Sequence, residues 1–141
     1  MAGAMARKLN KGFTLPELLL AFSVMALVLA GALSLFISCI FLNETNRNLS
    51  VATGHAQLVL EEIKNTNFVS MQSGAINPET NWDWDNAAIS AKGLIVLNTE
   101  SISTQAVWTG TDRLNVNVTV SWKDRGLRDR STSLETLITE P

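Results

Sequence analysis

Cysteine and histidine are almost missing from this chain, with one of each among 141 residues. A single cysteine, Cys39, cannot form a disulfide within the chain, so cysteine usage does not identify the compartment. His55 is the only histidine, so the chain has too few Cys and His side chains for most zinc sites and for most nucleophile–base pairs. The sequence also has no paired-carboxylate or phosphate-loop pattern. We therefore expect a protein that is not an enzyme and that holds no cofactor.

Charge is missing from a long stretch near the N-terminus. Residues 18–42 are 25 positions without a charged side chain. As an α-helix they extend over about 37 Å, which is enough to cross a hydrocarbon core of about 30 Å. A secretory signal peptide has a shorter apolar region, of about 7 to 15 residues, and its cleavage site follows that region. The run therefore predicts a helix that spans a membrane once.

The charges outside this run are unevenly distributed. Arg7, Lys8 and Lys11 precede the run and no basic residue follows it at once, which predicts a cytoplasmic N-terminus and an extracytoplasmic remainder. The net charge of the chain is −2, but without residues 1–12 eight basic and 13 acidic residues remain, a net charge of −5. This balance gives no general reason to expect nucleic-acid binding.

Proline is absent between Pro16 and Pro78, so the helix is expected to continue past the membrane to residue 66. One face of residues 43–66 is apolar at the helical period, and it comprises Leu49, Ala52, Ala56, Val59, Leu60 and Ile63. Val51 and Leu58 lie on nearly the opposite face, either as a contact for another subunit or as two ordinary exposed aliphatic residues. His55 falls on the polar side, where we expect a surface residue.

The composition changes after Asn67. Residues 67–92 are rich in Ser, Asn, Gly and Asp and predict an irregular loop between the helix and a sheet. Strand patterns follow in residues 93–98, 105–109, 114–122 and 131–139, of which 114–122 alternates strictly between apolar and polar residues. A turn is expected at residues 124–126. The predicted fold class is α+β, with a long N-terminal helix packed on a small antiparallel sheet of three or four strands within residues 93–141.

Glu17 is the only charged residue between Lys11 and Glu44. An ionised carboxylate in a bilayer costs several kcal/mol unless it is paired or lies at the interface, so its simplest role is to mark the membrane edge. Its neighbours indicate a more specific role. The sequence Gly12-Phe13-Thr14-Leu15-x-Glu17, after a basic leader and before an apolar helix, resembles the class III signal of type IV prepilins and pseudopilins.

This resemblance covers about the first 40 residues. It implies a pilin-like fold and a prepilin peptidase that removes the basic leader, residues 1–12, and methylates the new amine of Phe13. It also implies that residues 13–42 are the transmembrane and assembly half of the helix, with Glu17 as the assembly carboxylate. Glycine at Gly12 suits an extended chain in a protease cleft. Pairing of the Phe13 ammonium with Glu17, in the same or a neighbouring subunit, would neutralise both and fix the register of packed helices.

The chain departs from the family pattern at Pro16, and it lacks two features that are common in major pilins. Pro16 stands where an aliphatic residue is usual, and the first helical turn tolerates it. Major pilins often have a helix-breaking proline within the membrane half of the helix and a C-terminal disulfide loop. Here no proline occurs between Pro16 and Pro78, and a single cysteine cannot form the loop. The resemblance therefore implies a minor pilin or pseudopilin. Fainter similarities link residues 118–138 to minor pilins of the pilus-modification type and residues 56–63 to minor pseudopilins of type II secretion. Met1 and Met5 are both candidate starts, and a start at Met5 would give an eight-residue leader.

The partners that this implies are other pilins or pseudopilins of one filament, prepilin peptidase, an inner-membrane assembly platform and membrane lipid, without nucleic acid. The expected location is the bacterial inner membrane and then the pilus or pseudopilus. Three alternatives remain open: a minor pseudopilin at the tip of a type II secretion filament, a membrane-anchored binding module that never polymerises, and a metal-dependent enzyme.

Other polar clusters favour simpler interpretations. Glu79, Asp83 and Asp85 supply oxygen ligands that suit calcium, but they match no ligand spacing, and a solvated acidic loop is the simpler interpretation. Trp82 and Trp84 either cover the edge of the sheet or form a contact patch for another subunit. Four cations near the C-terminus are interleaved with acids, as in a solvated hairpin tip rather than a DNA-binding surface: Lys123, Arg125, Arg128 and Arg130. Cys39 is a small apolar residue that faces the membrane.

Overall fold

The structure is a computed structural model that describes residues 12–139. The chain divides into unit 1 (Met1–Leu42) and unit 2 (Asn43–Pro141), and helix α1 (Leu15–Lys64) contributes residues to both. The basic residues Arg7, Lys8 and Lys11, and the choice of start between Met1 and Met5, lie outside the described residues.

In unit 1, α1 begins at Leu15, and every residue from there to Leu42 is exposed. Within residues 12–139, α1 is the one helix that is long and apolar enough to cross a membrane, with a mean hydropathy of 2.6 in its most apolar window. The hydroxyls of Ser23 and Ser38 donate to backbone carbonyls one turn earlier, at 2.8 and 2.9 Å. Hydroxyls that are already bonded within a helix cost less to place in hydrocarbon.

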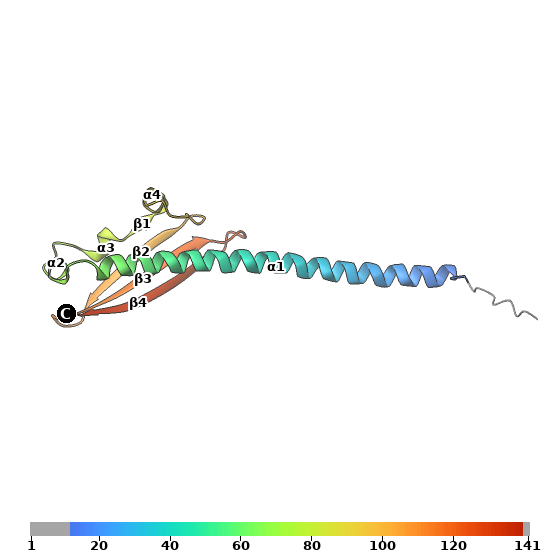
Figure 1. Ribbon diagram of the computed structural model, residues 1–141, viewed down its shortest axis with the longest axis horizontal. Helices are drawn as coiled ribbons and strands as arrows, with labels where there is room; N and C mark the ends of the chain where they lie inside the picture. The colour runs from blue at the N-terminus through green and yellow to red at the C-terminus, as the bar shows by residue number, and fades with distance from the viewer. Residues whose placement is uncertain (1–11, 140–141) are drawn as a thin grey trace, which may run out of the picture. The chain divides into compact units, whose positions relative to one another are not determined.

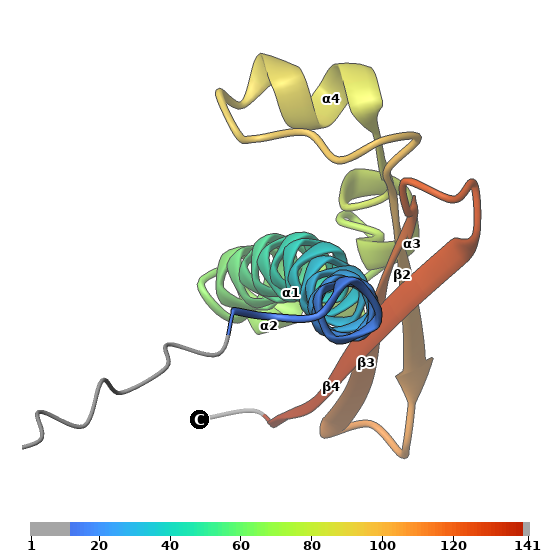
Figure 2. The same ribbon diagram turned by 90° about the vertical axis from the view of Figure 1, so that its right-hand side faces the viewer.

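In unit 2, the second half of α1 buries one face against a four-stranded sheet (Figure 1). The buried apolar residues of this helix are Ala52, Ala56, Val59, Leu60 and Ile63, as predicted. Leu49 was expected on this face but is 44% exposed, because the core begins at Ala52 and a helix face is covered only along the length that packs. Figure 2, which looks along α1, shows strands β2, β3 and β4 on one side of the helix.

The sheet consists of β1 (Trp84–Asp85), β2 (Ser101–Trp108), β3 (Arg113–Lys123) and β4 (Asp129–Thr139), in that order and with every pair antiparallel. This confirms the predicted α+β class with a long N-terminal helix and a small antiparallel sheet. The strictly alternating strand is β3, whose inward residues are at most 4% exposed: Leu114, Val116, Val118, Val120 and Trp122. On β4, Leu134 and Ile138 are half-buried against the same core.

The region predicted as an irregular loop contains three short helices, which are α2 (Phe68–Gln72), α3 (Pro78–Asn81) and α4 (Asn86–Ala91). Each one is started by an Asn or Asp side chain that accepts a backbone N–H, at 2.9 Å for Asn67, 3.0 Å for Asn77 and 2.8 Å for Asp85. The same Asn and Asp residues that predict a loop are therefore the N-caps of short helices.

The strand predicted at residues 93–98 is wrong. This segment lies outside the sheet, because no neighbouring strand pairs with it among the described residues. Its apolar side chains still reach the core, since Leu97 is buried and Leu94 and Val96 are half-buried. Gly93 ends α4 with a φ of +74°, a backbone conformation that favours glycine. The run thus packs on the core as a segment without regular structure rather than as a strand.

The two edges of the sheet differ. At the β1–β2 edge, the backbone N–H of Thr104 donates to the carboxylate of Asp83 at 2.6 Å, and that of Ala106 donates to the carboxylate of Glu79 at 3.2 Å. Side chains from the segment that contains α3 thus occupy the hydrogen-bonding groups of β2 beyond the two residues of β1. The opposite edge is β4, which pairs with β3 alone.

Candidate functional site

The start of α1 forms the candidate site that the sequence predicts. Gly12, Phe13 and Thr14 precede the helix without regular structure, and Phe13 is 83% exposed. A Cβ atom built on Gly12 would meet nothing within 4 Å. The packing of the described chain therefore does not require glycine at this position.

Thr14 and Glu17 are joined at the first turn. The carbonyl of Thr14 accepts the backbone N–H of Leu18 at 3.1 Å, and the Thr14 hydroxyl donates to Glu17 Oε2 at 3.5 Å. Thr-x-x-Glu is the spacing of a capping box, a helix-start signal that our sequence interpretation missed. Pro16 lies inside this first turn, as predicted, where its missing N–H costs no helical hydrogen bond.

The carboxylate of Glu17 is exposed at the beginning of the apolar run. It lines an open pocket with Gly12, Phe13 and Thr14. Between residues 12 and 139, no cation forms an ion pair with it. The positive end of the helix dipole stabilises an acid at this position, and a cationic group would complete its neutralisation. Chemically, the site can bind an ammonium next to an apolar surface.

His55 corrects one sequence prediction, because it is buried rather than exposed. Its Nδ1 lies 2.6 Å from Glu100 Oε1, and Glu100 Oε2 accepts the backbone N–H of Leu97 at 2.7 Å. This connects α1 to the segment before β2. A helical-wheel argument could not find the pair, because Glu100 is 45 positions away in the sequence. The pair satisfies buried polar groups and holds the two elements together.

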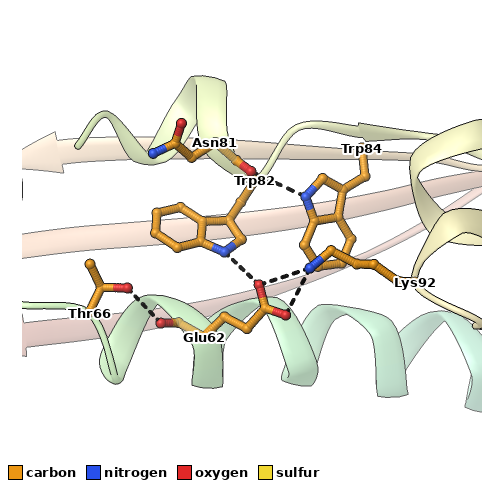
Figure 3. Close-up of polar contacts among 6 residues, drawn as sticks. All are labelled: Glu62, Thr66, Asn81, Trp82, Trp84 and Lys92. Carbon is orange, nitrogen blue, oxygen red and sulfur yellow. Dashed lines mark hydrogen bonds and ion pairs between the residues drawn. The ribbon is translucent and has the colours of Figure 1, made fainter.

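Of the two alternatives for Trp82 and Trp84, burial favours cover of the sheet edge over a contact patch, because the two residues are only 8% and 5% exposed. Figure 3 shows them around Glu62 of α1. Trp82 Nε1 donates to Glu62 Oε2 at 2.9 Å, and Lys92 Nζ lies 3.0 Å from Glu62 Oε1. The same Nζ is 4.1 Å from the centre of the Trp84 ring, a cation–π arrangement. This cluster connects α1 to β1 and to the end of α4.

The three candidate calcium ligands, Glu79, Asp83 and Asp85, accept hydrogen bonds from different backbone N–H groups. Glu79 and Asp83 accept from β2, and Asp85 accepts from the backbone N–H of Ala88 at the start of α4. Within the described part of the chain, no group of three His, Cys, Asp or Glu side chains is arranged to hold a metal ion. Glu79 and Asp83 thus hold the segment that contains α3 against the sheet, and Asp85 caps α4, so the three carboxylates do not converge on one point.

Val51 and Leu58 are half-buried and pack against the core of unit 2. Part of each side chain stays accessible, and a role for them in subunit contact stays a prediction. Cys39 is exposed on the apolar part of α1 in unit 1.

Comparison with known families matches one segment of the chain. Residues 7–33 match the prokaryotic N-terminal methylation motif. No curated protein and no solved structure matches the chain. The matched segment contains Gly12, Phe13 and Glu17 and leads into a single apolar helix that fits a single-pass membrane anchor. The chain therefore carries the N-terminal methylation signal of type IV pilins and pseudopilins, ahead of the long helix and antiparallel sheet that fit this class of protein.

Proposed function

We propose that the protein is a minor pilin or pseudopilin, a structural subunit that prepilin peptidase processes and that takes part in initiating or assembling a type IV pilus-like filament. The observation that carries this proposal is the exposed Glu17 carboxylate. It lies inside the matched motif, in the first turn of a helix whose apolar part, up to Leu42, is exposed within the described residues.

The chemistry of processing explains why this carboxylate is useful. Hydrolysis of the peptide bond between Gly12 and Phe13 gives a carboxyl group on Gly12 and an amine on Phe13, which is protonated at neutral pH. An ammonium and a carboxylate in a water-poor environment each need a counter-ion, and each supplies one to the other. Before the cut there is no ammonium at Phe13. Cleavage therefore creates the partner of Glu17 and acts as a switch for assembly.

The apolar half of α1 needs a cover in every state. Lipid covers it before assembly, with the chain in the inner membrane, its N-terminus in the cytoplasm and unit 2 outside. The helices of neighbouring subunits cover it in a filament. The minor class is supported by the absence of proline between Pro16 and Pro78 and by the single cysteine, which excludes an internal disulfide loop.

Mass spectrometry of the N-terminus tests this proposal in a host that has a prepilin peptidase and the remaining filament subunits. We expect a chain that begins at N-methylated Phe13. An intact leader on the mature protein would overturn the filament role.

Two variants then examine the carboxylate. Glu17→Gln keeps the size of the side chain but removes its charge, so we expect normal cleavage with loss of incorporation into sheared filaments. Thr14→Val is the matched control, because it removes the hydroxyl that contacts Glu17 but leaves the charge, and we expect it to be incorporated. If Glu17→Gln is incorporated as well as the control, then the carboxylate has no role in assembly. A chain that is cleaved but never found in filaments would instead be a membrane-anchored binding module.

A further inference from the structure

The positive charge of unit 2 is concentrated at one end. Residues 43–141 contain eight basic residues, five of which occur in two short segments: Arg47, Lys123, Arg125, Arg128 and Arg130. Three acids accompany them: Glu44, Asp124 and Asp129. This group has a net charge of +2, whereas the rest of unit 2 has three basic and nine acidic residues, a net charge of −6.

The two segments meet where the chain enters unit 2. Arg125 Nη1 lies 3.2 Å from Glu44 Oε2, which places the loop between β3 and β4 beside the first turn of this part of α1. An open groove in the same place is lined by Arg47, Lys123 and Arg125 together with residues 95–98. Glu44 follows the last residue of the apolar run, Leu42, by two positions.

The loop between β3 and β4 is held in a defined turn. The backbone N–H of Asp124 donates to the carbonyl of Arg128 at 2.9 Å, and that of Leu127 donates to the carbonyl of Asp124 at 2.8 Å. The Asp124 carboxylate accepts from the backbone N–H of Arg125 at 2.7 Å and lies 3.6 Å from Arg130. Asp124 is thus buried, and its carboxylate is already engaged within the loop. Arg125 pairs with Glu44, whereas Lys123 and Arg128 form no ion pair within residues 12–139.

Two aliphatic side chains project from the same end of the domain. Leu127, at the tip of the loop, is 73% exposed and has a φ of +55°, a conformation that is uncommon for leucine. Ile95, which lines the groove, is 61% exposed. Neither side chain belongs to the hydrophobic core of unit 2. Exposed aliphatic residues among cations are the chemistry of a protein surface that lies on lipid headgroups.

We propose that this end of unit 2, which we call the basic end (Arg47, Lys123, Arg125 and Arg128 with Ile95 and Leu127), docks on the anionic bilayer that anchors the same chain. The cations bind headgroup phosphates, and the two aliphatic side chains enter the interface. The bilayer is the favoured occupant because the basic end adjoins, in the chain, the last residue of the membrane-spanning run, so a lipid surface is always within reach. The proposal rests on membrane anchoring by α1 and not on a role in a filament.

A labelled full-length chain in lipid nanodiscs tests this docking. Leu127→Cys, in a Cys39→Ala background, carries an environment-sensitive fluorophore at the loop tip. In nanodiscs of phosphatidylglycerol and phosphatidylethanolamine, we expect blue-shifted emission and quenching by a lipid that carries its quencher at headgroup depth. In phosphatidylcholine alone, or at high salt, we expect emission typical of water, because screening weakens exposed charges. A label at Ala75→Cys, in the loop after α2, should stay in water in every lipid.

Matched charge variants test whether the cations of the basic end, and not simply the exposure of the loop, cause the docking. Arg47→Gln with Arg128→Gln removes two cations that form no ion pair within residues 12–139, so the fold should be kept. Each cation near an anionic surface contributes about fivefold to the ratio of docked to free states, so the pair should lower it about 25-fold. Lys64→Gln with Arg113→Gln removes the same charge elsewhere on unit 2 and should leave the ratio unchanged.

Three results would overturn the proposal: a label at position 127 that reports water in anionic nanodiscs, equal effects of the two charge pairs, or quenching that requires added DNA or a second protein. The nanodiscs contain neither peptidase nor other subunits, so a chain that fails to be cleaved or assembled in cells does not alter the outcome. Failure of the filament proposal and failure of lipid docking are therefore distinguishable.

Discussion

The imidazole of His55 and the carboxylate of Glu100 lie 2.6 Å apart inside unit 2 and join α1 to the segment that leads into β2. The second oxygen of Glu100 is also used, since it accepts the backbone N–H of Leu97. One buried carboxylate thus satisfies two groups that come from different parts of the chain. Loss of this carboxylate should therefore lower the stability of unit 2 as a whole.

Glu100→Ala should lower the free energy of unfolding of unit 2 by about 3–5 kcal/mol, because it leaves His55 and the Leu97 N–H buried without a partner. Glu100→Gln keeps an acceptor and should cost less. All four tryptophans lie in unit 2, so urea unfolding of the full chain in mild detergent can be followed by their fluorescence. Asp112→Ala, at an exposed site, is the control. Equal stabilities of Glu100→Ala and Asp112→Ala would show that the buried pair contributes nothing.

The carboxylate at the edge of β2 allows a similar comparison. Asp83→Ala removes the acceptor of the Thr104 N–H and should lower the free energy of unfolding by about 1–3 kcal/mol. Asp83→Asn retains a carbonyl oxygen in the same place and should recover most of this loss. The fluorescence-detected urea midpoint measures both variants. A deficit in Asp83→Asn as large as that in Asp83→Ala would mean that charge, and not the hydrogen bond, is what matters.

Gly54 offers a stabilising substitution. It lies in the interior of α1 on an exposed surface, and a Cβ built there meets nothing within 4 Å. Gly54→Ala should therefore raise the free energy of unfolding by about 0.5–1 kcal/mol, because alanine loses less backbone entropy in a helix. The same urea titration detects this as a higher midpoint with an unchanged slope. A lower midpoint would show that another surface, such as a neighbouring helix in detergent, closely approaches the glycine.

Gly12 is predicted to behave differently from Gly54. Gly12→Val should not change the unfolding of unit 2, because Gly12 has open space around it and precedes α1. It should sharply reduce removal of the leader, because a branched side chain at the cut restricts the extended conformation and fills the protease cleft. Co-expression with prepilin peptidase and intact-mass analysis gives the processed fraction. Gly31→Ala, within the membrane run, is the control and should be processed normally.

The elements that the sequence predicted correctly are those with a local and repeated pattern. β3 could be recognised because its five inward side chains alternate strictly with polar ones. The candidate site could be recognised because its glycine, carboxylate and apolar run are neighbours in the sequence. The capping-box spacing of Thr14 and Glu17 was missed because Glu17 had been interpreted only through its charge.

The remaining features depend on partners far away in the chain. Residues 93–98 have strand composition, but a strand also needs a neighbour, and β1 occupies the edge of the sheet instead. The burial of His55 depends on Glu100, and that of Trp82 depends on Glu62. Neither pair shares a periodic pattern in the sequence. Tertiary hydrogen bonds of this kind decide which polar residues enter a core, and composition alone does not reveal them.

The occupied edge of β2 has a consequence for how other chains can meet this domain. Glu79 and Asp83 use the outward N–H groups of β2, so an incoming strand finds no free donors at Thr104 and Ala106. Along β4, no side chain among residues 12–139 accepts from the backbone in this way. Pairing with a foreign strand is therefore blocked at these two positions of β2, and β4 is the edge that remains open to it.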